Sequence, residues 1–139
     1  MNAPDRAGIR STAKATVRGM ALLRDPLLNR GTAFTEQERD ALGLRGLLPA
    51  HVLSMQAQAE RVMTNLRSLP NDLEKYVALN ALHDRNEALF FRIVCDNIDE
   101  IQPLIYTPTV GLACQRFGHI FQRPRGLFIG ANDRGRIAD

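Results

Sequence analysis

The sequence predicts a mainly α-helical domain that leads into the start of an α/β domain with a parallel βαβ unit. Two observations predict this arrangement. Apolar residues recur at three- and four-residue intervals through most of the chain, and two short apolar runs, at residues 104–106 and 127–130, flank one more helical segment. Two strands do not make a stable sheet, so we expect the remaining strands of this sheet beyond residue 139.

The helical part begins with clear start and stop signals. Thr35 with Glu38 has the pattern of a capping box and predicts a short helix that Gly43 or Gly46 ends. Residues 47–49 begin the next helix, whose apolar face is formed by Val52, Met55, Ala59, Val62 and Leu66.

Two more helices follow before the predicted strands. Asn71 with Glu74 repeats the capping signal after the break at residues 68–71, and the apolar pattern continues to Ala81. A further helix runs through Leu89 and continues toward residue 101, and Pro103 is expected to stop it.

The last third of the chain predicts the βαβ unit. Leu104–Tyr106 forms a short buried strand, Thr109 caps a helix that begins at Val110 and that Gly118 closes, and residues 127–130 form the second strand. Residues 132–135 then form a turn.

Composition and charge describe an ordinary globular protein. The chain has 139 residues, 45% of them hydrophobic and 24% charged. No apolar run approaches the roughly 18 residues of a membrane-spanning helix, so we expect no membrane partner. Residues 1–30 hold six Arg and Lys against two Asp, a net charge of +4, whereas the whole chain carries +3. The basicity therefore belongs to the N-terminal segment, and we expect no nucleic-acid partner.

We read residues 1–25 as a basic, flexible N-terminal arm of a cytoplasmic protein. A transit peptide for the mitochondrial matrix is the alternative, because Ser, Thr and Ala lie among the arginines, but Asp5 and Asp25 argue against it. Cys95 and Cys114 lack metal-type spacing in their apolar helical contexts, and we expect reduced, buried thiols. The single histidines, His51, His83 and His119, predict structural or surface roles.

The segment after residue 115 combines arginines with aromatic residues. This composition superficially suggests nucleic-acid binding, but no nucleic-acid motif accompanies it. A turn with an aromatic core and solvated arginines explains it more simply; the residues are Arg116, Arg123, Arg125, Phe117, Phe121 and Phe128.

Tyr106 is the candidate for chemistry. At the C-terminal end of a parallel strand and just before a helix, it would lie where open α/β sheets place ligands, and the Thr109 region would offer free backbone N–H groups to a carboxylate. A packed amphipathic tyrosine is the alternative that sequence physics alone favours.

The run Tyr106-Thr107-Pro108-Thr109-Val110-Gly111 resembles the substrate-site segment of malic enzymes. The resemblance covers roughly residues 26–139, and the order and spacing of its pieces make it specific. The other pieces are Pro26–Thr35, Leu44–Pro49, Arg85-Asn86-Glu87, Arg116–Ile129 and Asp133-Arg134-Gly135.

The resemblance implies an N-terminal portion of an enzyme that converts L-malate to pyruvate and carbon dioxide with NAD or NADP and Mg²⁺ or Mn²⁺. It implies a helical domain over residues 26–103, a substrate domain that begins with residues 104–139, and a homo-oligomer. It also implies that Tyr106 is the general acid that protonates the enolpyruvate.

The lysine base, the carboxylates that hold the metal and the glycine-rich turn for the dinucleotide are absent from this sequence. We therefore expect the cofactor and metal residues to lie outside this chain, and the isolated chain to be inactive. The alternative function is a non-catalytic helical dimerisation module derived from a malic enzyme.

In some malic enzymes, two arginines at positions that match Arg61 and Arg85 bind the activator fumarate. A guanidinium suits a dicarboxylate, so the resemblance implies a possible allosteric site. The acidic residue of that site corresponds here to Leu53, and solvated or interface arginines are the alternative interpretation.

Overall fold

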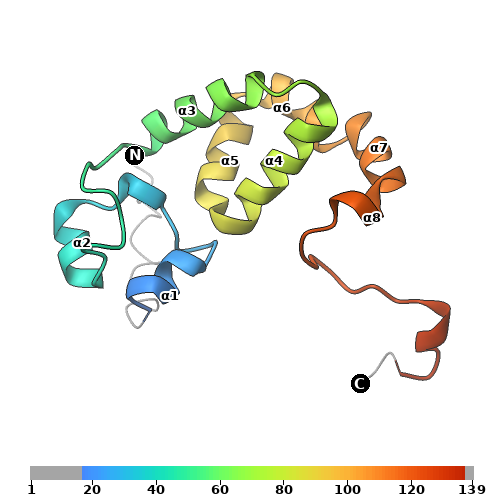
Figure 1. Cartoon of the computed structure of the whole chain (residues 1–139), viewed down its shortest axis with the longest axis horizontal. Coiled ribbons are helices and arrows are strands. Elements are labelled where there is room, and N and C mark those ends of the chain that lie inside the picture. The colour runs from blue at the N-terminus through green and yellow to red at the C-terminus, as the bar shows by residue number, and fades with distance from the viewer. Residues whose placement is uncertain (1–16, 137–139) are drawn as a thin grey trace, which may run out of the picture.

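The computed structural model describes residues 17–136, and helices are the regular secondary structure of these residues. The first helix, α1 (Gly19–Arg24), and the 3-10 helix η2 (Gly31–Ala33) precede α2 (Glu36–Leu42). Four longer elements follow: α3 (Met55–Arg67), α4 (Asp72–Arg85), α5 (Glu87–Asp96) and α6 (Ile98–Ile105). The chain ends with α7 (Thr109–Gln115), the short α8 (Phe117–Ile120) and the 3-10 helix η3 (Ala131–Asp133), in the order that Figure 1 shows.

The predicted helix starts are confirmed by their caps. The Thr35 side chain accepts from the Glu38 N–H and the Glu38 carboxylate accepts from the Thr35 N–H, which completes the capping box of α2. Gly43 ends this helix in the left-handed conformation. Asn71 caps α4 through the Glu74 N–H. The helix predicted from residues 47–49 begins later than expected, because Ser54 caps α3 and Met55 is its first residue.

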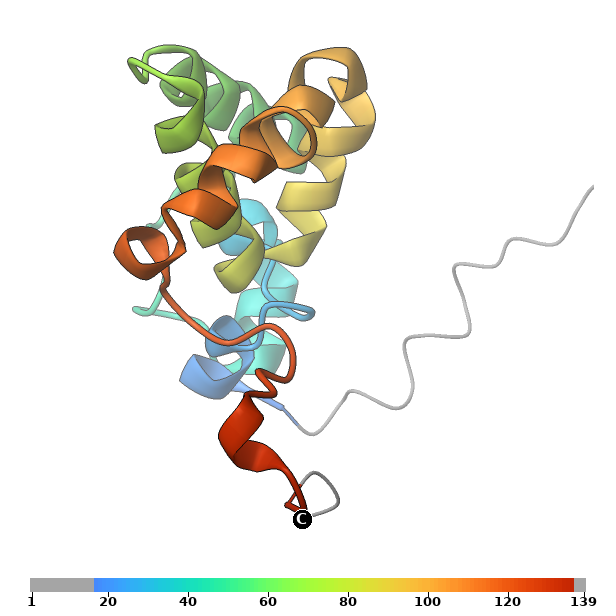
Figure 2. The ribbon, with the colours of Figure 1, turned by 90° about the vertical axis from the view of Figure 1, so that its right-hand side faces the viewer.

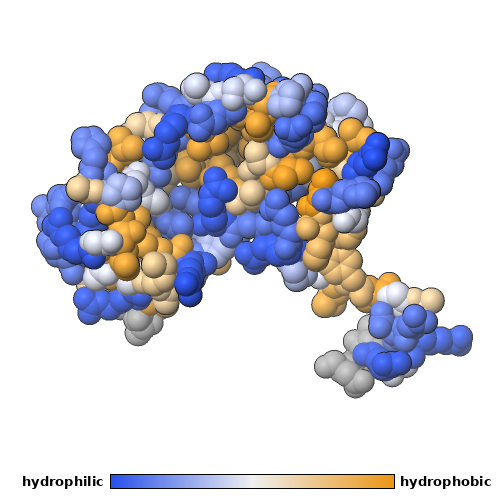
Figure 3. All heavy atoms as spheres, viewed as in Figure 1, coloured by the Kyte–Doolittle hydropathy of each residue, from blue (hydrophilic) through white to orange (hydrophobic). Residues whose placement is uncertain are grey.

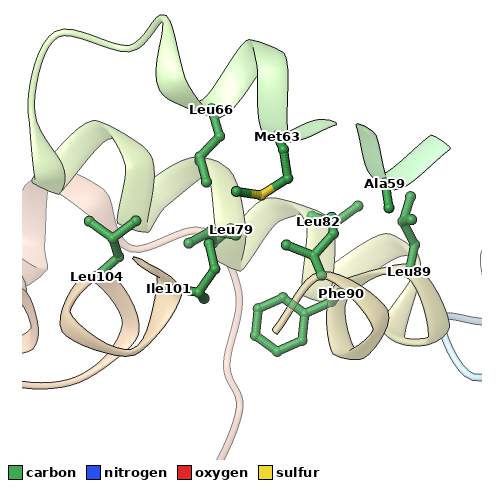
Figure 4. Close-up of a cluster of buried hydrophobic side chains, with 10 residues drawn as sticks. Ala59, Met63, Leu66, Leu79, Leu82, Leu89, Phe90, Ile101 and Leu104 are labelled. Carbon is green, nitrogen blue, oxygen red and sulfur yellow. The ribbon is translucent and has the colours of Figure 1, made fainter. Parts of the chain in front are cut away.

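One apolar core joins α3, α4, α5 and α6. The side chains of this core interdigitate between the four helices, as Figure 4 shows; they are Ala59, Met63, Leu66, Leu79, Leu82, Leu89, Phe90, Ile93, Ile101 and Leu104. A second, smaller cluster of Leu22, Phe34 and Leu44 holds the N-terminal segment together. Burial in these two clusters supplies the main stabilising contribution to the fold.

The prediction of two strands is wrong for the described residues, because residues 17–136 contain no strand. Leu104 is buried as part of α6, and Tyr106 is the residue that ends this helix. Residues 127–130 are extended but unpaired, and the side chains of Leu127, Phe128 and Ile129 are exposed. The expected βαβ unit is therefore replaced by the end of α6, the helix α7 and an extended segment.

Pro103 does not end a helix, contrary to the prediction. The break lies earlier, at Asn97, whose backbone and side-chain N–H groups both donate to the Ile93 carbonyl oxygen. Pro103 lies inside α6, where it removes one backbone hydrogen bond. Ile101 and Leu104 on the same helix are buried in the core, and this burial outweighs the lost bond.

Three further predictions concern the cysteines, the N-terminal arm and membrane-spanning helices. Both cysteines are exposed, so the prediction of buried thiols is wrong. Residues 1–16 of the expected arm lie outside the described residues, and α1 falls in its last part. None of the helices in residues 17–136 combines the length and apolar character needed to cross a bilayer.

Candidate functional site

Tyr106 lies at the junction of α6 and α7, at the end of a helix and not of a strand. Its backbone N–H donates to the Gln102 carbonyl oxygen at 2.9 Å, and its own carbonyl oxygen accepts from the Val110 N–H at 2.8 Å. These bonds fix the backbone on both sides of the residue. The side chain is 65% exposed, and the phenol has no hydrogen-bond partner within residues 17–136.

The structure does not provide the anion site expected at the start of α7. The N-cap is Pro108, which makes no side-chain cap, and Thr109 is buried as the first helical residue. The N–H groups of Val110 and Gly111 already donate to the carbonyl oxygens of Tyr106 and Pro108. A carboxylate near Tyr106 would therefore need partners other than these two amides.

An open groove runs between α7, α8 and the start of α4. Leu73, Thr109 and Leu112 contribute to its lining, and Arg116 and His119 bring the basic side chains. Tyr106 does not line this groove. The structure therefore brings Tyr106 together with α7 but does not include it in the lining of this groove.

Arg61 and Arg85 lie on different helices. Arg61 is exposed in the middle of α3, and Arg85 is the exposed last residue of α4. Arg85 lines a hollow with Val62 and Asn65 of α3, whereas Arg61 does not line it. Neither guanidinium forms a hydrogen bond or an ion pair with another residue of the described part of the chain.

Sequence reasoning missed a polar cluster on the C-terminal half of α4. Arg125 donates to the Asp84 carboxylate at 2.5 Å and to the Asn80 carbonyl oxygen at 3.1 Å, and Arg123 donates to the Asp84 carbonyl oxygen at 3.3 Å. Both arginines are exposed, as solvated arginines would be, but they also form these contacts, which the sequence does not predict. The signal in the sequence that could have indicated this cluster is Asp84, the acidic residue in the C-terminal half of α4.

The aromatic residues beside these arginines do form a cluster. The rings of Phe117, Phe121 and Phe128 lie with centroids 5.4 to 5.9 Å apart. All three side chains remain roughly half exposed, so this cluster lies at the surface and is not a closed core. Figure 3 shows apolar surface where the chain leaves the helical body toward its C-terminal end.

A metal-binding arrangement is absent from the described residues. No group of three or more His, Cys, Asp or Glu side chains within residues 17–136 could hold a metal ion. The one lysine in this range, Lys75, pairs with Asp72 at 3.2 Å at the start of α4. The part of the chain that the structure describes therefore offers one candidate acid, Tyr106, without a base or metal site beside it.

Comparison with known proteins finds similarity to malic enzymes. The family described as "Malic enzyme, N-terminal domain" matches residues 83–139. The chain is 54% identical over 121 residues to "NADP-dependent malic enzyme 1" of Arabidopsis thaliana. This alignment covers 87% of this chain and 21% of the relative. It is 53% identical over 116 residues to "NAD-dependent malic enzyme, mitochondrial" of Ascaris suum. This alignment covers 84% of this chain and 18% of the relative.

A third relative extends the comparison to a vertebrate. The chain is 50% identical over 121 residues to "NADP-dependent malic enzyme" of Columba livia. This alignment covers 87% of this chain and 22% of the relative. The chain thus spans about a fifth of the length of the relatives it matches. By these matches the chain is similar to the N-terminal portion of malic enzymes.

Proposed function

We propose that this chain forms the N-terminal part of an NAD(P)-dependent malic enzyme that converts L-malate to pyruvate and carbon dioxide. The observation that carries the proposal is the identity of about half of the aligned residues to malic enzymes over 84–87% of the chain. The relatives named above include two NADP-dependent enzymes and one NAD-dependent enzyme, so both cofactors are compatible with this similarity.

We propose Tyr106 as the general acid of this reaction. A phenol can donate a proton to the carbon of an enolate, and the exposed side chain leaves it free to meet a substrate. The backbone bonds to Gln102 and Val110 hold the residue at a fixed junction of two helices. A general acid needs such fixed placement because proton transfer requires hydrogen-bond distance to the reacting atom.

The residues of this chain do not fit the metal or the dinucleotide. Residues 17–136 contain no candidate metal cluster, and the sequence contains no Gly-x-Gly-x-x-Gly turn. Mg²⁺ or Mn²⁺ and NAD or NADP would be held by other parts of a complete enzyme. We therefore expect that the isolated chain does not turn over malate, since base, metal and cofactor must be held together with Tyr106.

The domain division expected from the sequence stays a prediction. A helical domain over residues 26–103 would be followed by the start of the substrate domain at residues 104–139. Leu104 packs into the helical core together with Ile101, which argues for placing the junction a few residues later, after α6.

We further propose a cytoplasmic homo-oligomer. Phe91 on α5 and Ile98 on α6 are half exposed large apolar side chains, and such residues favour burial in an interface. The same exposed residues support the second candidate function, a non-catalytic helical dimerisation module. Fumarate activation through Arg61 and Arg85 stays a prediction, and Leu53 stands where the acidic residue of that site is expected.

A test of the proposal uses the complete coding sequence that contains this chain. Tyr106→Phe should lower kcat by about 100-fold or more while the KM for malate changes little, because a general acid contributes on the order of 10²–10⁴ in rate. Tyr76→Phe is the matched control, since Tyr76 is the other tyrosine and lies half-buried on α4. An unchanged kcat in Tyr106→Phe removes Tyr106 from the mechanism.

The isolated chain separates the two candidate functions. Pure chain incubated with L-malate, NAD or NADP and Mn²⁺ should give no reduced cofactor, and turnover contradicts the expected inactivity. If the complete coding sequence adds no lysine base, metal-binding carboxylates or dinucleotide turn, the enzyme proposal fails. A dimer in light scattering would then favour the dimerisation module.

A further inference from the structure

The segment that follows α8 returns to the C-terminal half of α4. Figure 2 shows the extended segment that follows α8. Its polar attachment to α4 consists of Arg123 and Arg125, which meet Asn80, His83 and Asp84. We call residues 121–128 the latch segment. It encloses a hollow lined by Tyr76, Val77 and the aromatic cluster of Phe117, Phe121 and Phe128.

Arg125 is the anchor of the latch segment. Its guanidinium meets three acceptors on α4: the Asp84 carboxylate at 2.5 Å, the Asn80 carbonyl oxygen at 3.1 Å and Nδ1 of His83 at 2.5 Å. The Asp84 side chain is only 17% exposed, so this ion pair is partly desolvated. A planar guanidinium that satisfies several acceptors at once gives geometric specificity that a single surface ion pair lacks.

The contact between Arg125 and His83 fixes the protonation state of the imidazole. A guanidinium carries only donors, so Nδ1 of His83 must be the acceptor and must carry no proton. The remaining proton lies on Nε2, 3.9 Å from the Glu87 carboxylate. The docked latch segment therefore selects the neutral imidazole in its Nε2–H tautomer.

The His83 ring cannot turn away easily when it gains a proton. It stacks on Phe90 with centroids 4.2 Å apart and planes 10° apart, and it meets the edge of Phe91 at 5.3 Å. These contacts hold Nδ1 toward Arg125. A proton on Nδ1 would face the guanidinium N–H directly, and one of the two groups would have to move. Arg125, on an extended and exposed segment, is the group that can move.

The charges around His83 come from three parts of the chain. Asp84 on α4 and Glu87 at the start of α5 attract a protonated ring, whereas Arg125 of the latch segment repels it. Arg123 also reaches Asp84, with Nε at 3.7 Å from the carboxylate. The segment after α1 contributes the uncharged Pro26 to a second hollow, which His83 and Arg125 also line. Two carboxylates near the ring would stabilise the imidazolium once the latch segment has left.

We propose that residues 121–128 form a pH-sensitive latch that Arg125 holds on α4, and that protonation of His83 releases it. This inference does not depend on malic enzyme activity. Release would move Phe121 and Phe128 away from Tyr76 and Val77, open the hollow between them and free the segment that continues the chain from α8.

The direction of the pH dependence follows from the surroundings of His83. Burial lowers the pKa of His83 below its ordinary value, and the Arg125 charge lowers it further, against the attraction of Glu87 and Asp84. A lowered pKa in the docked state means that docking is favoured when the imidazole is neutral. The docking contribution is complete above the ordinary histidine pKa of about 6.5 and is lost as the pH falls through the lower pKa of the docked state.

Hydrogen exchange of the whole chain, read by mass spectrometry and expressed as protection factors, tests this latch. In the wild type, protection of peptides within residues 121–128 should fall several-fold between about pH 8 and about pH 5. In His83→Asn the side-chain oxygen can still accept from Arg125 but does not titrate, so protection should stay constant over the same range. His119→Asn is the matched control and should keep the wild-type pH dependence.

Two further variants keep the test decisive if His83→Asn destabilises the helical body. Glu87→Gln removes an attraction that favours the imidazolium, so the midpoint of release should move to lower pH. Arg125→Met should leave the latch segment unprotected at every pH while core amides of α4 stay protected. Constant protection of the wild type across this range, or identical pH profiles of the wild type, His83→Asn and Glu87→Gln, would overturn the proposal.

Discussion

Gly31 packs directly against the side chain of Gln58, so closely that a Cβ atom on Gly31 would overlap Oε1 of Gln58. Gln58 is buried, accepts from the Thr32 N–H at 3.3 Å and donates to the Arg30 carbonyl oxygen at 3.2 Å. This contact attaches the segment before α2 to the first turns of α3. The backbone of Gly31 is also left-handed, with φ +56°.

Gly31→Ala should therefore destabilise the chain more than an ordinary glycine replacement. The matched control is Gly43→Ala, because Gly43 is also left-handed, with φ +67°, but has open space around its Cβ position. Gly43→Ala should cost about 1 kcal/mol of unfolding free energy from backbone strain alone. Gly31→Ala should cost at least about 2 kcal/mol more, because it also displaces a buried, hydrogen-bonded amide. Urea unfolding measures both values.

A double-mutant cycle separates the overlap from the strain. Gln58→Ala removes the side chain that Gly31→Ala would strike, so the double variant should be more stable than the sum of the two single effects predicts. Additive effects would show that the overlap relaxes at no cost. Equal losses in Gly31→Ala and Gly43→Ala would lead to the same conclusion.

Arg39 carries a buried charge without a carboxylate partner in the described residues. The side chain is 2% exposed, and its guanidinium donates to backbone carbonyl oxygens of two segments. The acceptors are Phe34 at 2.9 Å, Pro49 at 2.7 Å, Ala50 at 3.1 Å, Thr32 at 3.2 Å and His51 at 3.4 Å. One side chain thus joins the segment around η2 to the loop between α2 and α3 by satisfying carbonyl groups of both.

Arg39→Lys should lower the unfolding free energy by about 2–4 kcal/mol although it keeps the charge. A lysine ammonium cannot replace the several N–H donors of the planar guanidinium, and it leaves buried carbonyl oxygens unpaired. Arg45→Lys is the matched control, because Arg45 pairs with Asp40 and Glu36 on the exposed side of α2. An exposed ion pair contributes about 0–1 kcal/mol, so this variant should stay near the wild type. Similar losses in both variants would show that burial of Arg39 does not matter.

The helices that could be predicted are those whose signals are local. The caps at Thr35 and Asn71 each involve groups three residues apart, so the sequence contains both partners. The prediction of a strand at residues 104–106 fails for a different reason. A run of three or four apolar residues fits a strand or a helix equally well, and only the burial of Leu104 with Ile101 in the core selects the helix.

The surroundings of Tyr106 depend on tertiary structure and could not be predicted in the same way. The sequence predicts Tyr106 at the end of a strand and just before a helix; it does precede α7, but its exposed side chain lies at the end of α6 and not at a sheet. The contacts of Arg125 join residues more than forty positions apart in the sequence. No local pattern marks such a pair, so the arginine was predicted to be solvated.

The pH dependence of stability should reveal the ion pair between Arg30 and Glu38. Burial raises the pKa of Glu38, but the hydrogen bond from Arg30 and that from the Thr35 N–H outweigh it, and the net pKa is lowered. A lowered carboxylate pKa means that stability is present above the ordinary value of about 4.3 and is lost as the pH falls through the folded-state pKa. Wild type should therefore lose more stability than Glu38→Gln between about pH 6 and about pH 3.

Arg30→Gln tests the cause of this difference. Without the guanidinium, the capping bond to Thr35 alone lowers the pKa of Glu38, so the acid-induced loss of stability should be smaller than in the wild type. Unfolding in urea at each pH measures the three curves. If Arg30→Gln and the wild type lose stability in parallel, the ion pair does not set the pKa of Glu38.

The exposure of Cys95 and Cys114 predicts that both thiols react in the folded protein. A thiol-specific chromogenic reagent should modify two equivalents without denaturant, because both side chains reach solvent on α5 and α7. Cys95→Ser and Cys114→Ser should each remove one equivalent, which assigns the reaction to its residue. A serine at either position should leave the melting temperature nearly unchanged, since an exposed thiol adds little to the core. A thiol that reacts only after unfolding would show that its helix face is covered in solution, and for Cys95 the covering surface would include the neighbouring exposed side chains of Phe91 and Ile98.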